Sequence, residues 1–599
     1  MEKIININSK RGNINKTIES SNAEKSLEKT YVSNISVAID YNIKGYADIY
    51  QKQNRYYKNT PKDFKQISNF IIELKAVIQN EDRQSLQCNI ITDKYEEIEI
   101  DFDLKDFLSV NNFKKTLYSK NMTLYFNGKN EDLGNIKGIL FKEEYNKILG
   151  KTNTGIYKQN NDYIYVGDNE SIDKSGNVVN NVRYTGSTYL SSNITKSLPI
   201  SDNELKEISK YLFNFNEIGI TASILGFCSS CFLREMLYIE NNTKGPHLFV
   251  SGEAGSGKSE TLQYIIMPLF NTSFKMSAEQ CTRFVNVKYA GSSNTIPFII
   301  EEYKPTRMSK VRRDEISALI RNGYDRTSAY RGNAEQELNE YKVITPIILL
   351  GEMAIEESAG LERSIMVCFS KYKSQTNGRE ESFNYLKKNQ QITMKLGRAL
   401  LHEALNIDAE VLLKRYTDLE SKYSNLPGRV RNNVVNCMLG ILLIKDVYDR
   451  KGINFQDSIG YKTDDIFEAI VSNTIETVFE GNTGVKGIIE KDIEILNDMI
   501  ETGELVKGID YQMLNSKTEL AINVKMFYPK LLKYINSHNL KEIDKLSQNE
   551  FTKQLKLKEY YMDYKAVRFV HDTEAKNAKA FVLDVVKLAT KVNIDNFYL

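Results

Sequence analysis

One segment of the chain combines glycine, lysine and serine in a spacing suited to phosphate binding. Residues 252–259, GEAGSGKS, match the pattern G-x-x-x-x-G-K-[ST] in full. Glycines let backbone N–H groups wrap the phosphates, the Lys258 ammonium reaches the β- and γ-phosphates, and the Ser259 hydroxyl ligates Mg²⁺. An apolar strand-like segment, 247–251, precedes the pattern and a helical pattern, 260–270, follows it, which is the context this site requires. We therefore expect ATP and Mg²⁺ to be bound by Gly252, Glu253, Ala254, Gly255, Ser256, Gly257, Lys258, Ser259 and Glu260. A glycine-rich turn that matches by chance is the alternative.

Two adjacent carboxylates end a second apolar segment. Glu301 and Glu302 follow 297–300, and a P-loop needs an acidic partner on a neighbouring strand. We expect Glu301 to hold the Mg²⁺ shell and Glu302 to orient and deprotonate the attacking water. Glu301 stands where Asp is the usual residue. Two solvated acids at a strand end are the alternative interpretation.

Two further residues extend this predicted site. Glu352 follows the apolar segment 343–350, where a sensor of the γ-phosphate or the attacking water is expected, although Asn is usual there. Arg363 directly precedes the apolar segment 364–370. That position suits an arginine finger that reaches the γ-phosphate of a neighbouring subunit. An ordinary surface arginine is equally compatible with the spacing.

Composition restricts the class of protein. The 599 residues predict three or four domains, and 41% hydrophobic with 26% charged residues excludes wholesale disorder. Lys plus Arg total 80 against 78 for Asp plus Glu, so any nucleic-acid surface must be local. No apolar run approaches a membrane span, the N-terminus is polar without a secretory signal, and six cysteines make no disulfide framework. We expect a cytoplasmic protein with no membrane partner.

Periodicity places the motifs on an α/β framework. From residue 247 to about 370, apolar strand-like runs alternate with helical patterns, which predicts a parallel sheet. In 98–104, apolar residues alternate with acids, the period of a half-buried strand, and QNND at 159–162 predicts a hairpin. Residues 549–561 read as a helix, and 566–570 with 580–586 read as two strands. Helix plus hairpin is the pattern of a winged helix, a fold that binds DNA or proteins.

The order of these parts resembles the AAA+ ATPases of the superfamily III-like and MCM-like replicative helicases carried by phages, plasmids and integrative elements. The segments SSNTIPFIIEEYKP, ILLGE and LERSI are the specific part of the match. The resemblance implies a flexible N-terminus at 1–30, an α+β N-terminal module at 31–195 and a helical linker at 196–245. It further implies an AAA+ P-loop ATPase core at 246–375, a helical lid at 376–485 and a winged-helix-like C-terminal domain at 486–599. In the lid, Arg429 or Arg431 would sense the nucleotide in cis.

Basic residues cluster between the acid pair and the sensor segment. Residues 304–332 hold eight cations against three acids, and ring helicases place basic loops here, facing the central pore. We expect DNA contacts from Arg312, Arg313, Arg326 and Arg331, with Tyr324 and Tyr330 stacking on bases. Solvated or interfacial arginines, some completing a neighbour's ATP site, are the alternative. The C-terminal helix adds candidate DNA contacts at Lys553, Lys556 and Lys558.

Two other patterns carry weaker signals. The run 52–65 mixes basic and aromatic residues, a slight indication of single-strand binding, and a solvated face is the preferred interpretation. Cys228 and Cys231 form C-x-x-C inside an apolar stretch without a second pair, so a buried helix face is expected and no metal site.

The sequence thus predicts an ATP hydrolase that translocates on single-stranded or forked DNA as a homo-oligomer, a hexameric ring. An AAA+ replication initiator or remodelling ATPase that binds DNA without unwinding it is the first alternative. A scaffold in which nucleotide only stabilises an oligomer is the second, and the intact Lys258 with Glu301 and Glu302 argues against it.

Overall fold

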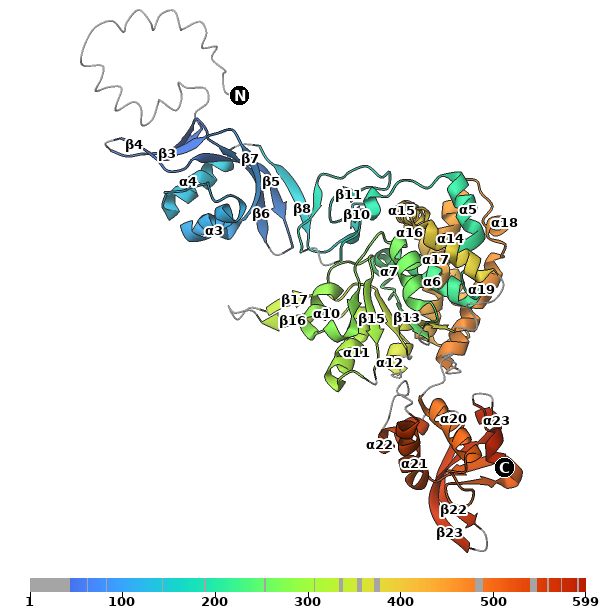
Figure 1. Cartoon of the computed structure of the whole chain (residues 1–599). Coiled ribbons are helices and arrows are strands. Elements are labelled where there is room, and N and C mark those ends of the chain that lie inside the picture. The colour runs from blue at the N-terminus through green and yellow to red at the C-terminus, as the bar shows by residue number, and fades with distance from the viewer. Residues whose placement is uncertain are drawn as a thin grey trace, which may run out of the picture. The chain divides into compact units, whose positions relative to one another are not determined.

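The computed structural model describes residues 44–598, apart from 62, 82, 143, 188–189, 253–254, 306, 333–337, 353–357, 371–377, 480–487, 539–546, 557, 559, 572–573 and 590–591. The chain divides into two compact units (Figure 1). One comprises residues up to 152 together with 179–185, and the other comprises 153–178 together with 186 onward. The division therefore differs from the expected N-terminal module at 31–195, because 153–178 and 186–195 belong to the second unit.

The first unit is an α+β fold built on two sheets. The four-stranded sheet has the order β1 (Gly45–Tyr46), β2 (Ile49–Lys52), β3 (Arg55–Asn59), β4 (Phe64–Gln66). The five-stranded sheet has the order β12 (Val182–Tyr184), β8 (Asn146–Lys151), β5 (Phe70–Gln79), β6 (Gln84–Thr92), β7 (Glu97–Asp103). Helices α3 (Val110–Lys120) and α4 (Asn130–Leu140) pack against a core whose aromatic rings come from Tyr56, Phe70, Phe102, Phe126 and, on α3 itself, Phe113. Strand β7 confirms the predicted alternation, since Ile100 and Phe102 are buried while Glu99 and Asp101 are exposed.

A five-stranded parallel sheet forms the centre of the second unit. Its order is β14 (Met276–Ser277), β15 (Phe298–Tyr303), β18 (Ile347–Gly351), β13 (His247–Gly252), β19 (Ser364–Phe369). Each neighbouring pair is parallel, as the alternation of strand-like and helical patterns predicts. Strands β13, β18 and β19 are buried along their whole length, which explains their continuous apolar runs.

Helices cover both faces of the parallel sheet. On one face, α6 (Ile218–Ser230) packs on β13 and β19 and against α17 (Gly428–Arg450) and α19 (Thr463–Thr474). The other face packs on α10 (Arg283–Ala290) and α11 (Lys310–Asp325) (Figure 1). Further helices of this unit include α5 (Asp202–Leu212), α7 (Arg234–Asn241), α12 (Ser358–Leu361), α14 (Arg379–Lys388), α15 (Gln390–Asn406), α16 (Ala409–Lys422) and α18 (Phe455–Ile459). A small sheet, β11 (Ser171–Ile172), β10 (Asp162–Val166), β9 (Gly155–Gln159), confirms the hairpin predicted at QNND.

Helices α6 and α17 approach closely enough to exclude side chains. A Cβ on Gly440 would lie 1.9 Å from the carbonyl oxygen of Gly226. Cys228 and Cys231 are buried on α6, as the sequence predicts. Within the described residues, no single helix is long and apolar enough to cross a bilayer, while the bent pair α6 and α7 meets the length and composition only when taken together.

The C-terminal residues form a module of helices packed on a four-stranded sheet. Its elements are α20 (Ile488–Glu501), β20 (Tyr511–Leu514), β21 (Glu519–Ile522), α21 (Val524–Ser537), α22 (Gln548–Leu555), β22 (Tyr561–His571), β23 (Glu574–Asp584) and α23 (Val585–Ala589). The sheet order is β20-β21-β23-β22. Helix α22 is shorter than the expected 549–561, and the strands are longer than expected. Cross-strand pairing from Tyr561–Leu583 to His571–Glu574 accounts for the difference, because it draws residues from 561 onward into extended backbone.

The Gly226–Gly440 contact generates a stability prediction. Gly440→Ala forces a methyl group into a backbone carbonyl, and overpacking of this kind costs about 3 kcal/mol. Gly428→Ala is the matched control, since no atom lies within 4 Å of a Cβ there and alanine favours the same helix. We expect chemical denaturation to show a lower midpoint for Gly440→Ala alone. Equal midpoints for the two variants would contradict the close helix contact.

Candidate functional site

The predicted phosphate-binding loop lies at the carboxyl end of β13. Gly252, Gly255 and Gly257 have φ values of 147°, 75° and 93°, a backbone conformation that side chains disfavour. A Cβ on Gly252 would also lie 2.3 Å from the carbonyl oxygen of Phe369 on β19. These glycines let successive N–H groups point into one concavity, which is how backbone binds an anion. Glu253 and Ala254 lie outside the described residues.

The loop leads directly into a helical segment. Lys258 begins α8 (Lys258–Thr261), and its Nζ donates to the carbonyl oxygen of Gly252 at 2.6 Å and lies 3.5 Å from Ser256 Oγ. The ammonium is therefore held over the loop's own concavity. A π turn (Leu262–Ile266) follows, before Pro268, which has no N–H for the carbonyl four residues earlier.

The two predicted acids occupy a bulge at the end of β15. The pairing of β15 with β18 shifts register between Ile300 and Tyr303, and Glu302 has a φ of 59°. Such a bulge redirects side chains near functional sites. Glu301 forms an ion pair with Lys275 at 2.7 Å, and Ser277 Oγ donates to Glu302 Oε2 at 3.0 Å. Both carboxylates are thus held by the edge segment around β14.

Glu352 lies between the loop and the acid strand. The sequence suggested that the acid strand is the immediate neighbour of β13. In the structure β18 lies between β15 and β13. Glu352 follows β18 and pairs with Lys304 at 2.7 Å. Burial acts to raise the pKa of the Glu352 carboxyl, but hydrogen bonding to Lys304 and the charges of Lys304, Lys258 and Arg307 hold that pKa below its usual value. Strand β18 pairs with β13 with Leu350 opposite Val250, so Glu352 at the end of β18 lies beside the loop that follows β13.

These residues fit a nucleotide with its Mg²⁺ ion. No group of three or more His, Cys, Asp or Glu side chains suited to a metal ion occurs in the described part of the chain. Mg²⁺ in nucleotide sites takes one or two protein ligands and completes its shell with phosphate and water oxygens. The Ser259 hydroxyl and the Glu301 carboxylate are the two oxygens that the sequence predicts for this role.

Arg363 lies at the opposite edge of the same sheet. It precedes β19, whose first residue pairs with His247 at the start of β13, whereas the loop follows the end of β13. The length of β13 separates the two edges by roughly 16 Å. Arg363 is 8% exposed, and its guanidinium pairs with Asp325 at 3.0 Å and lies against the Tyr324 ring. It is therefore placed away from the loop of its own subunit.

The same edge holds residues that the sequence assigned to other roles. Arg326 is 4% exposed in its side chain, pairs with Glu235 at 2.7 Å and lies 3.9 Å from the centre of the Tyr238 ring. The structure does not support Arg326 as a DNA contact, because its guanidinium is committed inside the fold. Tyr324 is 2% exposed and its hydroxyl accepts a hydrogen bond from Asn432, so the interpretation of Tyr324 as a base-stacking residue is wrong.

The lid arginines also lie at this edge. Arg429 pairs with Glu362, the neighbour of Arg363, at 2.9 Å. Arg431 donates to the carbonyl oxygen of Ser424 and lies 3.7 Å from Glu420. Neither interaction brings these residues to Lys258. Their role as in-cis nucleotide sensors stays a prediction. On the loop side, Lys387 of α14, within the segment expected to form a lid, pairs with Glu260 at 2.8 Å.

The remaining DNA-contact candidates fall on separate elements. Arg312 and Arg313 lie in the first turn of α11 and bond to the carbonyl oxygens of Cys281 and Pro305, with the Arg312 side chain 24% exposed. Arg331 lies on a two-stranded hairpin, β16 (Ala329–Gly332) and β17 (Leu338–Tyr341), that is separate from the parallel sheet (Figure 1). The side chains of Tyr330 and Arg331 lie outside the described residues.

In the C-terminal module, the candidate lysines differ from one another. Lys556 is exposed and lies over the rings of Tyr564 and Phe581. Lys558 pairs with the buried Glu490, and the side chain of Lys553 lies outside the described residues. The sequence analysis missed four exposed cations on the hairpin, although their clustering within two strand-like runs was a usable signal: Lys565, Arg568, Lys576 and Lys579.

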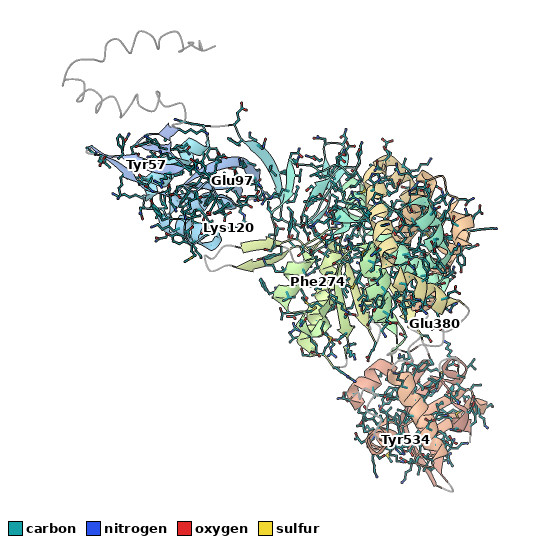
Figure 2. The ribbon with its side chains drawn as sticks, turned by 45° about the horizontal axis from the view of Figure 1, so that its top comes forward. Tyr57, Glu97, Lys120, Phe274, Glu380 and Tyr534 are labelled. Carbon is teal, nitrogen blue, oxygen red and sulfur yellow. The ribbon has the colours of Figure 1, made fainter. Side chains whose placement is uncertain are left out.

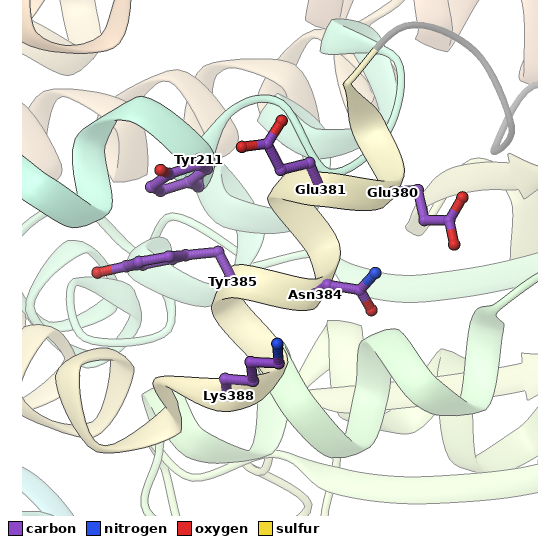
Figure 3. A pocket seen from close by; sticks show the side chains of 6 residues that line it. All are labelled: Tyr211, Glu380, Glu381, Asn384, Tyr385 and Lys388. Carbon is purple, nitrogen blue, oxygen red and sulfur yellow. The ribbon is translucent and has the colours of Figure 1, made fainter.

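A cavity of about 530 Å³ opens between α5 and α14. Its lining residues are Tyr211, Glu380, Glu381, Asn384, Tyr385 and Lys388 (Figure 3). The Tyr211 and Tyr385 rings stack with centroids 4.0 Å apart, so no planar ring fits between them. The cavity borders the helix whose Lys387 contacts Glu260, and no sequence prediction concerns it.

Comparisons with known proteins bear on the fold. No protein-family model matches the chain, and no curated protein matches it. Among solved structures, the Cch protein of SCCmec type IV, described as an active helicase, is similar with a TM-score of 0.50 at 12% identity, covering 90% of this chain and 99% of that one. The apo C-terminal region of NrS-1 gives a TM-score of 0.22 at 12% identity over 55% of this chain and 92% of that one, which supports no argument. The first similarity shows a shared fold.

The burial of Arg326 predicts that this residue stabilises the fold and does not contact DNA. Arg326→Ala leaves Glu235 without its partner inside the fold, which costs about 3 kcal/mol. Lys310→Ala, on the exposed first turn of the same helix, is the control and changes stability by no more than about 0.5 kcal/mol. Denaturant unfolding of the two variants measures the difference. An Arg326→Ala protein of unchanged stability and weakened DNA affinity would restore the DNA-contact assignment.

Proposed function

We propose that the chain is an ATP hydrolase that drives movement along single-stranded DNA, of the ring-forming replicative helicase type carried by phages and mobile elements. The observation that carries the proposal is the convergence of the loop, the Glu301–Glu302 bulge and Glu352 at one edge of one parallel sheet. In parallel α/β sheets, ligands bind at the carboxyl edge where strand order reverses, and β13 lies at that point. The fold shared with an active helicase supports the same class.

Each residue of the site has a distinct role in this proposal. The loop N–H groups and Lys258 bind the triphosphate and offset the charge that develops in the transition state. Mg²⁺, held through Ser259 and Glu301, supplies charge neutralisation at the phosphate oxygens. Glu302 accepts the proton of the attacking water once its carboxylate leaves Ser277, and Glu352 fixes the position of that water or of the γ-phosphate.

Arg363 acts on the neighbouring subunit. Its place at the amino edge separates it from its own loop, so a role in hydrolysis requires another copy of the chain. Its present partner is Asp325, and the arginine must exchange that carboxylate for a phosphate when subunits meet. An arginine supplied in trans is worth about 10³-fold or more in rate. This requirement favours a closed ring, and a hexamer is the form we propose.

The DNA path runs over elements that project from the core. We propose that Arg331 on the β16–β17 hairpin contacts phosphates in the ring channel, together with Arg312 and Arg313 of α11. We propose that the C-terminal module acts as a winged helix, a role supported by helix α22 followed by the hairpin β22–β23, with Lys553, Lys556, Lys558 and the cations of the hairpin as its DNA contacts. The long basic hairpin equally suits an initiator or remodelling ATPase that binds DNA without unwinding it.

A strand-displacement assay on forked DNA separates these functions. Wild-type protein with ATP and Mg²⁺ should release one strand and hydrolyse ATP faster when single-stranded DNA is present. Lys258→Ala should lose hydrolysis because the γ-phosphate loses its point charge, and Glu302→Gln should bind ATP and lose turnover because the proton acceptor is gone. Forks carrying only a 3′ or only a 5′ tail give the polarity.

Two results would count against this proposal. DNA-stimulated hydrolysis without strand release would favour the initiator or remodelling ATPase. Hydrolysis by Glu302→Gln at the wild-type rate would remove Glu302 from the proton-accepting role and leave Glu301 as the remaining acid of the pair.

A further inference from the structure

The four-stranded sheet of the first unit has one buried and one exposed face. The cross-strand pairs Tyr50–Tyr57, Lys52–Arg55, Tyr57–Gln66 and Asn59–Phe64 place alternate residues of β2, β3 and β4 on the same side. The opposite side carries the buried residues Ile49, Gln51 and Tyr56. The exposed side thus carries Tyr50, Lys52, Arg55, Tyr57, Asn59, Phe64 and Gln66.

Aromatic rings on this face form a continuous row. The Tyr50 and Tyr57 rings are nearly parallel, at 18°, with centroids 5.6 Å apart, and the Phe64 ring meets Tyr50 edge-on at 5.7 Å. Phe64 is 47% exposed, and Tyr57 lies at the surface (Figure 2). Tyr125 extends the row, because its hydroxyl accepts a hydrogen bond from Gln66 of β4.

Two exposed apolar side chains border the row. Tyr95 is 79% exposed in the β6–β7 turn, and Met122 is 81% exposed in the segment before Tyr125. Asn69 fixes both segments beside the sheet: its Nδ2 donates to the carbonyl oxygen of Thr123, its Oδ1 accepts from Tyr125 N, and its carbonyl oxygen accepts from Asp93 N. The segments that carry Tyr95, Met122 and Tyr125 are therefore held beside the sheet by hydrogen bonds to Asn69.

The charged residues at the alternate positions are cations, and two acids, Asp63 and Asp93, lie beside this face in the adjoining turns. Lys52 and Arg55 are the charged residues contributed by the alternate positions of β2, β3 and β4, and no acid stands among these positions. Arg55 is oriented by Asp93, which lies in the neighbouring turn at 2.9 Å. Asn59 and Gln66 add amide groups beside the rings. Rings, amides and cations on one exposed sheet match the chemistry of bases and phosphates.

We propose that this face binds single-stranded nucleic acid, with Tyr50, Tyr57 and Phe64 stacking on successive bases while Lys52 and Arg55 contact phosphates. Stacking on aromatic side chains tolerates any base and is worth tenfold or more in affinity for each base. The binding site needs no ATP and stands whether or not the proposed helicase activity is correct.

Binding of a short fluorescent oligothymidylate to the full chain without nucleotide tests the proposal. Tyr57→Ala combined with Phe64→Ala should weaken binding by about tenfold or more, measured by anisotropy. Tyr57→Phe keeps the ring and should keep the affinity. Tyr118→Ala, an equally superficial tyrosine on α3 at 37% exposure, is the matched control and should bind as the wild type does.

An abasic oligonucleotide of the same length separates stacking from charge. The two ring deletions should leave its affinity unchanged, whereas Lys52→Ala should weaken both oligonucleotides and flatten the log–log salt dependence by about 0.7. Ring deletions that leave oligothymidylate binding intact would overturn the proposal. A change in oligomeric state with intact DNA binding would also overturn it and identify the face as a contact between copies.

Photocrosslinking of a bromodeoxyuridine oligonucleotide to the wild-type chain does not depend on the folding of any variant. Crosslinks within 50–66 or at 95 and 125 would support the proposal. Crosslinks confined to 304–341 and 548–584 would refute it while leaving the proposed helicase contacts intact.

Discussion

The burial of one parallel sheet on both faces constrains the rest of the second unit. Helices cover β13, β18 and β19 on each side, so polar chemistry is confined to the two edges where the strands begin and end. The carboxyl edge carries the loop with Lys258, the acid pair and Glu352. The amino edge carries Arg363 and the buried ion pairs of Asp325 and Glu235. One sheet thus separates the groups proposed to bind phosphate from the arginines of the opposite edge.

Local backbone conformation sets the geometry at the carboxyl edge. The bulge in β15 provides one residue more than β18 opposes, and the positive φ of Glu302 turns its carboxylate toward Ser277. Lys258 is similarly held by the carbonyl oxygen of Gly252. Both groups that the proposed reaction uses are therefore bonded within the chain, and each must exchange a partner for ATP or water. In this proposal, nucleotide binding breaks one hydrogen bond within the loop and one between the acid strand and β14.

The sequence predicts features that depend on residues close together in the chain, and it does not predict contacts between distant segments. The loop is local, since its glycines, Lys258 and the flanking strand and helix lie within one short segment. Arg326 could not be assigned correctly, because its partner Glu235 lies on α7, far earlier in the chain. The insertion of β18 beside β13 depends on sheet order, and the bulge at Glu302 depends on that neighbour. The aromatic row in the first unit required the register of three strands, so the run 52–65 alone carried little information.

Nucleotide binding must draw Lys258 and Glu302 away from their present partners if the proposed reaction is to take place. A structure of the full chain with Mg²⁺ and a non-hydrolysable ATP analogue tests this directly. We expect Lys258 Nζ to leave the carbonyl oxygen of Gly252 for the β- and γ-phosphate oxygens, with Ser259 and Glu301 around the metal and Glu302 turned from Ser277 toward the γ-phosphate. Phosphates bound outside the 252–259 loop, or a loop-bound analogue with Lys258 and Glu302 still on Gly252 and Ser277, would contradict the account.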